Sequence, residues 1–546
     1  MTETRAVSSA GAAVAPPPTE RRPHGLADLL GTSDHLAVGR LFVGTSLLFL
    51  LIAGVAGGVV GVDRIDGAAD LVSGAYGQLL TLHGVGATFL FAIPVFCGLG
   101  IAVVPLQVGA RTVAFPRAAA AAYWVWAFSG ALVLVAYLIN GGPGGGRLDG
   151  RLLWIVALAG VLVGLCLAAV CIATTVLALR TPGLSLYRLP MFAWSMLVAS
   201  SLWLLTLPVL AGILVLTYLD TRYFAGIYDG FGNYDGLRWA LGQPQVVAFA
   251  LPALGVIGDI AATATGARQR SRIGLYTTIA AIGVLGIGAD TFFQAVEPEV
   301  LTDPLYVGVG LALVLPLVAF TGGIGDTLRR GRLRVTGPLV LALASLLMFL
   351  AGAAAGAVRV IEPFDLVGTT ADASYTHYVL LAGAIGAIAG MFHWSTKLYG
   401  VVLADGAAKA AGALLLVGTV ALALPDLVSG LLDQRRGSIG DQRAGVAALN
   451  VVSAIGGVLV VLGLLSVTAT VARGARAGRA GVGRDAPADP WGGLTLEWAT
   501  TSPPEPGNFG AVEDVRSPEP LLDRREAQGE GPPPGGREAA HGGETD

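Results

Sequence analysis

Three of the six histidines in this chain lie inside or beside strongly apolar runs, and they carry most of its capacity for chemistry. His83, in "TLHGVGATFL", and His377, in "SYTHYVLLAG", each lie close to the start of such a run. An imidazole can ligate a metal ion, relay a proton or make a hydrogen bond between helices. Ionisable residues inside a membrane are rare and commonly functional. The chemistry open to this pair therefore depends on the elements that hold the two rings.

Those elements are membrane helices. The chain has 546 residues, of which 54% are hydrophobic and 13% charged, whereas a soluble domain carries about 25% charged residues. Apolar runs long enough to cross roughly 30 Å of hydrocarbon recur along it. Backbone groups in lipid must be satisfied internally, so each such run is a helix. The composition predicts an all-α polytopic membrane protein in a lipid bilayer, and nothing in it points to nucleic acid.

Twelve transmembrane helices are predicted, with ends uncertain by several residues. They cover residues 40–62, 79–106, 118–140, 152–178, 192–218, 245–267, 274–295, 303–325, 335–357, 373–396, 404–424 and 446–472. We expect three regions: a disordered N-terminal tail at 1–30, the membrane domain at 31–473, and a largely disordered C-terminal tail at 474–546. Arg and Lys concentrate in the even-numbered loops and just after the last span, as at Arg329, Arg330 and Arg473. The positive-inside rule then places both termini in the cytoplasm, with the chain in the cell membrane.

His83 and His377 each lie about five residues inside a predicted span. Both spans start from the same, non-cytoplasmic side. With about 1.5 Å of rise per residue, both imidazoles lie roughly 6–8 Å below that surface. Two histidines at one depth can ligate both faces of one haem iron. A polar contact between helices and a proton relay are the alternatives. Arg435 and Arg436, in "DQRRG", lie on the same side and suit the haem propionates.

His393 lies about 24 Å further along the helix of His377, so it cannot join that site. We expect it at the membrane interface near the cytoplasmic end. Two acids in apolar runs are ambiguous. Asp290 is either a proton or cation site or an acid at a helix end, and Asp259 is expected to be exposed at the interface.

Several stretches resemble subunit I of the haem-copper oxidases, of the cytochrome c oxidase type. In chain order they are "TSDHLAVGRLFV", "HGVGATFLFAIPVFCGLGIAVVPLQVGARTVAFPR", "LPMFAWSMLVASSLWLLTLPVLAGILVLTYLDTRY", "THYVLLAG" and "DPWGGLTLEWATTSPPEPGNF". The resemblance covers about residues 31–510. It implies twelve helices, one low-spin haem of type a or b ligated by His83 and His377, and propionate binding by Arg435 and Arg436.

The departures from the family pattern concern its oxygen site. Where the family reads Gly-His-Pro-Glu-Val-Tyr, this chain reads "GQPQVV", so a copper-ligating histidine becomes Gln243 and a tyrosine becomes Val247. The family's His-His pair aligns with Phe292 and Phe293, and the ligand of its high-spin haem aligns with Tyr375. Residues of its two proton pathways align with Thr112 and Phe320. By resemblance, a complete enzyme needs six metal-binding histidines in its helices, two for the low-spin haem, one for the high-spin haem and three for copper, which is more than this chain has there.

Glutamine and phenylalanine do not replace these ligands, because copper prefers imidazole nitrogen and phenylalanine has no lone pair. Tyr375 could ligate a second haem as a phenolate only with a cation nearby, and no Lys or Arg lies within one helical turn in sequence. We therefore expect no copper and ordinary packing for Tyr375.

The sequence thus predicts a haem-bearing electron-transfer or accessory subunit of a respiratory complex that has lost oxygen reduction. Its expected partners are a subunit II-like or cytochrome c-like protein. One alternative is a non-redox structural or assembly protein on the same fold. The less favoured alternative is an active terminal oxidase, so whether the chain is an enzyme stays open.

Overall fold

The computed structural model describes residues 31–65, 74–224, 246–295, 307–436, 445–482, 486–510 and 515–529. The chain divides into two units, Met1–Thr32 and Ser33–Asp546, and the following concerns the second. The regular secondary structure of its described part is helical, apart from one isolated β-bridge between Thr369 and Arg435.

Eleven helices in the described residues are long and apolar enough to cross a membrane. They are α2 (His35–Asp63), α3 to α4 (Tyr76–Gln107), α5 (Pro116–Leu138), α6 (Leu148–Ala178), α7 (Met191–Tyr223), α9 to α10 (Val247–Thr265), the helix ending in α13 (Val307–Arg330), α14 (Gly337–Arg359), α15 (Thr370–His393), α17 (Asp405–Leu431) and α18 (Val446–Arg479). A further helix, α11 (Arg272–Ala295), follows α10 and has an apolar stretch at Arg272–Gly286. The twelve predicted spans therefore each have a helix.

The helices that carry the two histidines have distinct local features. His83 lies on α3 (Tyr76–Ala87), which continues through a single π-helical turn, Thr88–Ala92, into α4 (Ile93–Gln107). Such π-turns are rare and often lie at functional sites. The hydroxyl of Thr88 donates to the carbonyl of Gly84 over 2.8 Å at this turn. His377 lies on α15, whose first turn is capped by the Thr369 side chain, which accepts from the Ala371 amide.

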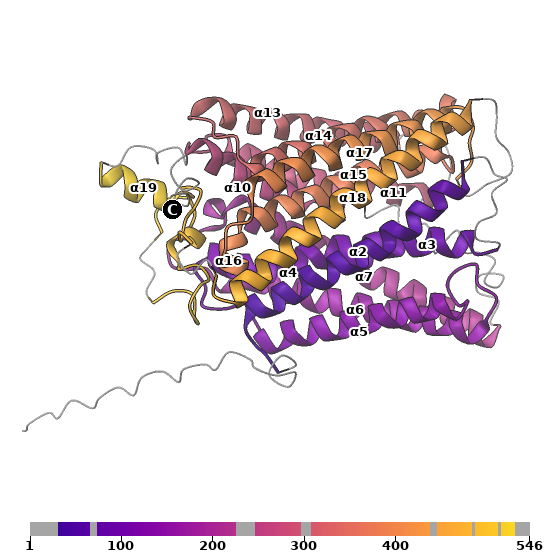
Figure 1. Cartoon of the computed structure of the whole chain (residues 1–546), viewed down its shortest axis with the longest axis horizontal. Coiled ribbons are helices and arrows are strands. Elements are labelled where there is room, and N and C mark those ends of the chain that lie inside the picture. Colours follow the sequence, from indigo (N-terminus) through magenta and orange to yellow (C-terminus); the bar gives the residue numbers. More distant parts are fainter. Residues whose placement is uncertain are drawn as a thin grey trace, which may run out of the picture. The chain divides into compact units, whose positions relative to one another are not determined.

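Small residues let neighbouring helices approach closely. A methyl group added at Gly386 on α15 would lie 2.4 Å from the Cβ of Ala253 on α10, and one at Gly383 would lie 2.9 Å from that of Ala250. Such contacts replace the hydrophobic driving force that is absent between helices in lipid. Helices from opposite ends of the chain also lie side by side, since α18 packs against α2 (Figure 1). Helices closer in sequence pack together as well: α18 against α17, and α15 against α14 and α17.

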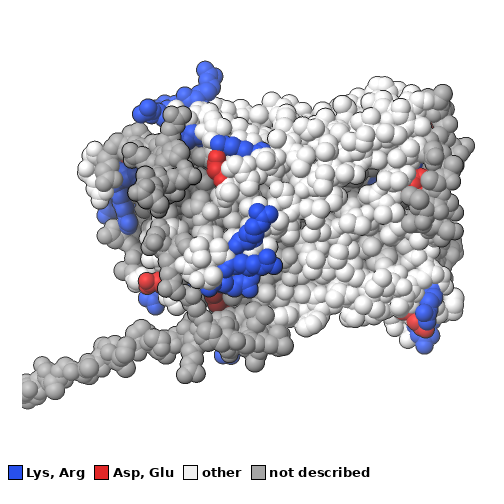
Figure 2. Space-filling view, viewed as in Figure 1, with Lys and Arg blue, Asp and Glu red and all other residues white. Residues whose placement is uncertain are grey.

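The charged groups lie toward the two ends of the helices. On the face shown in Figure 2, the Lys, Arg, Asp and Glu side chains leave a broad uncharged zone between them. Large apolar side chains on the spans are exposed, for example Leu205, Val209 and Leu315, which are 70%, 63% and 72% exposed. The molecule therefore presents a lipid-compatible belt, and it is a multi-pass membrane protein.

The C-terminal segment differs from the expectation of a largely disordered tail. Residues 486–510 and α19 (Pro520–Ala527) pack at the end of the bundle where α16 (Ser395–Tyr399) lies. Lys397 donates to the Thr500 carbonyl over 2.7 Å, and the Trp491 indole donates to the His393 carbonyl over 2.8 Å. Residues 530–546 lie outside the described residues, and the predicted boundaries at 30 and 473 stay predictions.

Candidate functional site

His83 is held against α2. Its Nδ1 lies 2.9 Å from the carbonyl oxygen of Ala53 on that helix. The ring packs on Gly57, one turn further along α2, where an added Cβ would lie 2.4 Å from Nδ1 and 2.6 Å from Cε1. Glycine at this position is therefore a condition for the observed ring position, and the hydrogen bond fixes the ring so that Nε2 is the nitrogen available for a ligand.

The structure brings His377 to His83. The ring centroids are 5.8 Å apart and the ring planes are inclined by 61°. The two residues are remote in sequence and come from different helices, α3 and α15. This is the arrangement predicted from their matched depth, although its role as a haem site stays a prediction.

A third group that the sequence reasoning missed completes this site. Asp426, on α17, is 1% exposed, and its Oδ2 lies 3.6 Å from Nδ1 of His377. Its Oδ1 accepts hydrogen bonds from the Arg64 guanidinium and, over 3.0 Å, from the Ser453 hydroxyl. An acid in the apolar run "ALALPDLVSG" is the signal that could have revealed it.

Arg435 and Arg436 follow α17 on the same end of the bundle. The amide of Arg436 donates to the Gly368 carbonyl over 3.0 Å, which ties this loop to the residues just before α15. Arg435 points outward: its side chain is 55% exposed and lies 3.4 Å from the carboxylate of Asp365. Arg436 is half-buried and within electrostatic range of His83. Of the two, Arg436 is the more buried.

The histidine pair suits one metal ion between its rings. A metal–imidazole nitrogen bond is about 2 Å long, so two imidazoles on opposite sides of one ion have ring centres about 6 Å apart. The observed 5.8 Å is close to this separation. Histidine ligands commonly use their second nitrogen to contact a carbonyl or carboxylate, which fixes the ring. Ala53 offers a carbonyl to His83, and Asp426 offers a carboxylate to His377.

Tyr375 is packed between helices. It is 5% exposed, and its ring lies 3.0–3.2 Å from where a Cβ at Gly356 of α14 would be. The Arg359 guanidinium lies 5.4 Å from the ring centroid, and Arg359 also pairs with Asp372 over 2.7 Å. Sequence proximity could not reveal this cation, because it comes from the neighbouring helix. The cation is neutralised by Asp372, and the ring faces packed side chains, as expected for ordinary packing.

The other positions that align with the family's oxygen site are only partly described. Val247 is 5% exposed and lies against α11, since a Cβ at Gly286 would be 2.8 Å from its side chain. Gln243 lies outside the described residues, and so do the side chains of Phe292, Phe293 and Asp290. Within the described ranges, no three His, Cys, Asp or Glu residues are grouped to hold a metal ion.

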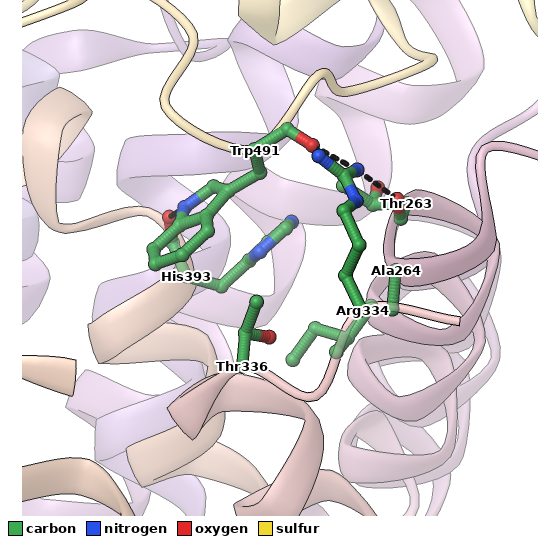
Figure 3. A pocket seen from close by; sticks show the side chains of 7 residues that line it. Thr263, Ala264, Arg334, Thr336, His393 and Trp491 are labelled. Atoms are coloured by element: carbon green, nitrogen blue, oxygen red, sulfur yellow. Dashed lines mark hydrogen bonds between the residues drawn. The ribbon is translucent and has the colours of Figure 1, made fainter. Parts of the chain in front are cut away.

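Two residues that we expected at the membrane interface are buried: the expected exposure of Asp259 was wrong, and the interfacial position of His393 stays a prediction. His393 is 2% exposed, because the C-terminal segment covers it and its ring stacks with Trp491 at 6.3 Å between centroids. Figure 3 shows this ring between Trp491 and Arg334, beside a small pocket. Asp259 is 7% exposed. It caps the start of α7, accepting from the amides of Met191 and Phe192 over 2.8 and 3.1 Å.

Asp259 belongs to a second buried polar cluster. The Gln107 amide group donates to Asp259 over 2.9 Å and to Glu497 over 3.1 Å. Burial and, next, the charge of Asp259 raise the pKa of Glu497 to about 7. Burial lowers the pKa of Lys397 to about 8, against the attraction of Glu497. This cluster ties the C-terminal segment to the bundle, far along α15 from the histidine pair.

Comparison with known proteins accounts for this architecture. Residues 37–459 match the family model described as cytochrome c and quinol oxidase polypeptide I. This chain belongs to that family. It is 31% identical to a putative cytochrome c oxidase subunit 1-beta of Streptomyces coelicolor, over 90% of this chain and 89% of the relative. It is also 31% identical to a probable cytochrome c oxidase subunit 1-beta of Nocardia farcinica, over 94% and 90%.

The fold of this cytochrome c oxidase subunit I homologue also resembles a solved structure. A heme-copper terminal oxidase dimer, studied by cryo-EM, aligns with a TM-score of 0.65 over 80% of this chain and 84% of its own, at 15% sequence identity. Identity at that level shows the shared fold alone. The predicted fold class and the family resemblance are therefore both confirmed.

Proposed function

We propose that this subunit I homologue holds a single low-spin haem between His83 and His377 and serves as an electron-transfer or accessory subunit of a respiratory complex. One observation supports the proposal: two imidazoles on different helices lie with their ring centroids 5.8 Å apart, and each has a polar group of another helix on its Nδ1 side. The haem would supply a one-electron couple. Because both axial positions would be taken by imidazoles, the iron would have no open position for oxygen.

The proposal also holds that oxygen reduction has been lost. The whole chain has six histidines, and the helices long enough to cross the membrane hold four of them: His83, His377, His393 and, at the first residue of α2, His35. By resemblance, a working oxygen site needs four metal-binding histidines in addition to the pair that ligates the low-spin haem. His393 is buried at the far end of α15 among Trp394, Trp491 and Trp498, so it cannot supply one of them. Copper is therefore not expected.

The residues around the histidine pair indicate the side from which an electron-transfer partner would approach. Arg436 and, further out, Arg435 lie at the end where propionates would emerge, and guanidinium groups bind such carboxylates well. An electron donor or acceptor would approach from this side. We assign this side to the non-cytoplasmic face of the cell membrane, with both termini in the cytoplasm, and expect a subunit II-like or cytochrome c-like partner there.

The test is spectroscopic. The purified protein should show a low-spin haem signal in reduced-minus-oxidised spectra, no carbon monoxide shift and no stoichiometric copper. His83→Ala and His377→Ala should each abolish haem retention, whereas the control His393→Ala should keep it. A protein without haem would support the structural or assembly alternative. A carbon monoxide shift with stoichiometric copper would instead support an active terminal oxidase.

A further inference from the structure

The two histidines of the site have chemically different partners. The Nδ1 of His83 faces a neutral backbone carbonyl, that of Ala53. The Nδ1 of His377 faces the carboxylate of Asp426, at 3.6 Å. Among the described residues, neither His377 Nδ1 nor Asp426 Oδ2 makes a hydrogen bond to a third group, and the two atoms lie 3.6 Å apart. The site is therefore asymmetric in charge.

Asp426 is placed where a charge acts strongly. Its side chain is 1% exposed inside a membrane helix, so water does not screen it. Its other oxygen, Oδ1, is held by Arg64 at the end of α2 and by Ser453 on α18. Arg64 is itself fixed, because Asn450 on α18 donates to its carbonyl over 2.9 Å. Three helices thus hold the carboxylate against one face of the site.

A buried acid in lipid is costly and is normally retained for a function. Its Oδ1 is already paired with Arg64, and that pairing does not require contact with a histidine. The carboxylate nevertheless directs its second oxygen at His377. A carboxylate behind a ligating histidine makes the imidazole a more basic ligand. Nearby negative charge also stabilises ferric over ferrous iron, and a cation does the opposite.

We propose that the Asp426–Arg64 pair sets the reduction potential of the site through His377. This inference rests on the proposed function, since it concerns the haem that His83 and His377 would hold. Asp426 lowers the potential and Arg64 raises it, so the native value is a balance of two buried charges of opposite sign. Both are positioning residues that act through His377, and Asp426 contacts it directly.

Redox titration of four variants tests the inference. Asp426→Asn keeps the shape and removes the charge, so we expect reduction to be favoured at least tenfold, a rise of about 59 mV for a one-electron couple. Arg64→Gln should lower the reduction potential by a similar amount. The double variant removes both charges and should return toward the native value. Asp426→Glu keeps the charge and should stay close to native.

Asp372→Asn is the matched control. Asp372 is also a buried acid, 3% exposed, on the same helix as His377, but its partner is Arg359 rather than a histidine. The reduction potential should shift clearly less in Asp372→Asn than in Asp426→Asn. The electron paramagnetic resonance g values of the ferric haem should change in Asp426→Asn but not in Asp372→Asn. A purely structural role for Asp426 would move neither readout.

The experiment distinguishes a failure of this inference from a failure of the proposed function. If the haem is present and both Asp426→Asn and Arg64→Gln shift reduction by less than threefold, the inference is overturned while the proposed function stands. If Asp426→Asn loses its haem, Arg64→Gln and Asp426→Glu still decide the sign of the effect. A native protein without haem overturns the inference and the proposed function together.

Discussion

Gly57 on α2 is the residue against which the His83 imidazole packs. A Cβ at this position would lie 2.4 Å from Nδ1 of the ring, far inside van der Waals contact. The neighbouring Gly58 has no heavy atom within 4 Å of the same built position. Two adjacent glycines on one helix therefore differ in a way that only the three-dimensional site explains, since helix propensity treats them alike.

We predict that Gly57→Ala displaces His83 and lowers the haem-to-protein ratio, because the added methyl group and the imidazole cannot occupy the same space. Gly58→Ala should keep the haem, and both variants gain about the same helix propensity, up to about 1 kcal/mol. Absorbance spectra and haem content of the two purified variants make the comparison. Equal haem content in both would contradict the assigned position of His83.

The C-terminal segment is an element whose attachment depends on one buried acid. Glu497 is fully buried, and its Oε1 accepts from Gln107 and Trp394. Burial and the charge of Asp259 raise its pKa from 4.5 to about 7. The docked segment therefore binds the proton more tightly than a released segment does. The bound proton therefore stabilises the docked segment. This stabilisation is fully present below pH 4.5 and is lost as the pH rises through 7.

We predict that docking of residues 486–510 weakens by about 3 kcal/mol between pH 4.5 and pH 8, from 1.36 kcal/mol per pKa unit. Hydrogen exchange of this segment, corrected for intrinsic rates at each pH, should show faster opening at high pH. Glu497→Gln should remove the pH dependence. Glu505→Gln, an exposed change in the same segment, should leave it intact. An unchanged profile in Glu497→Gln would contradict the assignment.

At the scale of the whole molecule, hydropathy was enough to find the spans, since lipid forces each long apolar run into a helix. The depth of His83 and His377 followed from their distance to the span ends. The partnership of Asp426 with His377 did not follow, because it depends on which faces of α15 and α17 meet. Burial of Asp259 and His393 depends on α7 and the C-terminal segment, contacts remote in sequence.

The number of crossings between α10 and α14 decides the orientation of the whole chain. The Arg334 amide, before α14, donates to the Ala264 carbonyl at the end of α10 over 2.9 Å. The loops 266–271 and 331–336 therefore lie at one end of the bundle, so the chain between them crosses it an even number of times, as it does if α11 and the helix ending in α13 both span. With an even number the following helices keep the orientation of the proposed topology, in which the Arg-rich ends lie on the cytoplasmic side.

We predict the side of three exposed loop positions by cysteine labelling, in a chain whose Cys97, Cys166 and Cys171 are replaced by serine. Arg270→Cys and Arg332→Cys should react with a membrane-impermeant maleimide only after the cells are opened, because the proposed orientation places both at the cytoplasmic end. Arg147→Cys, between α5 and α6, should react in intact cells. If Arg270→Cys and Arg332→Cys label on opposite sides, α11 or the helix ending in α13 does not span. If all three sides are exchanged, both termini lie outside, and the face assigned to the haem partner is reversed.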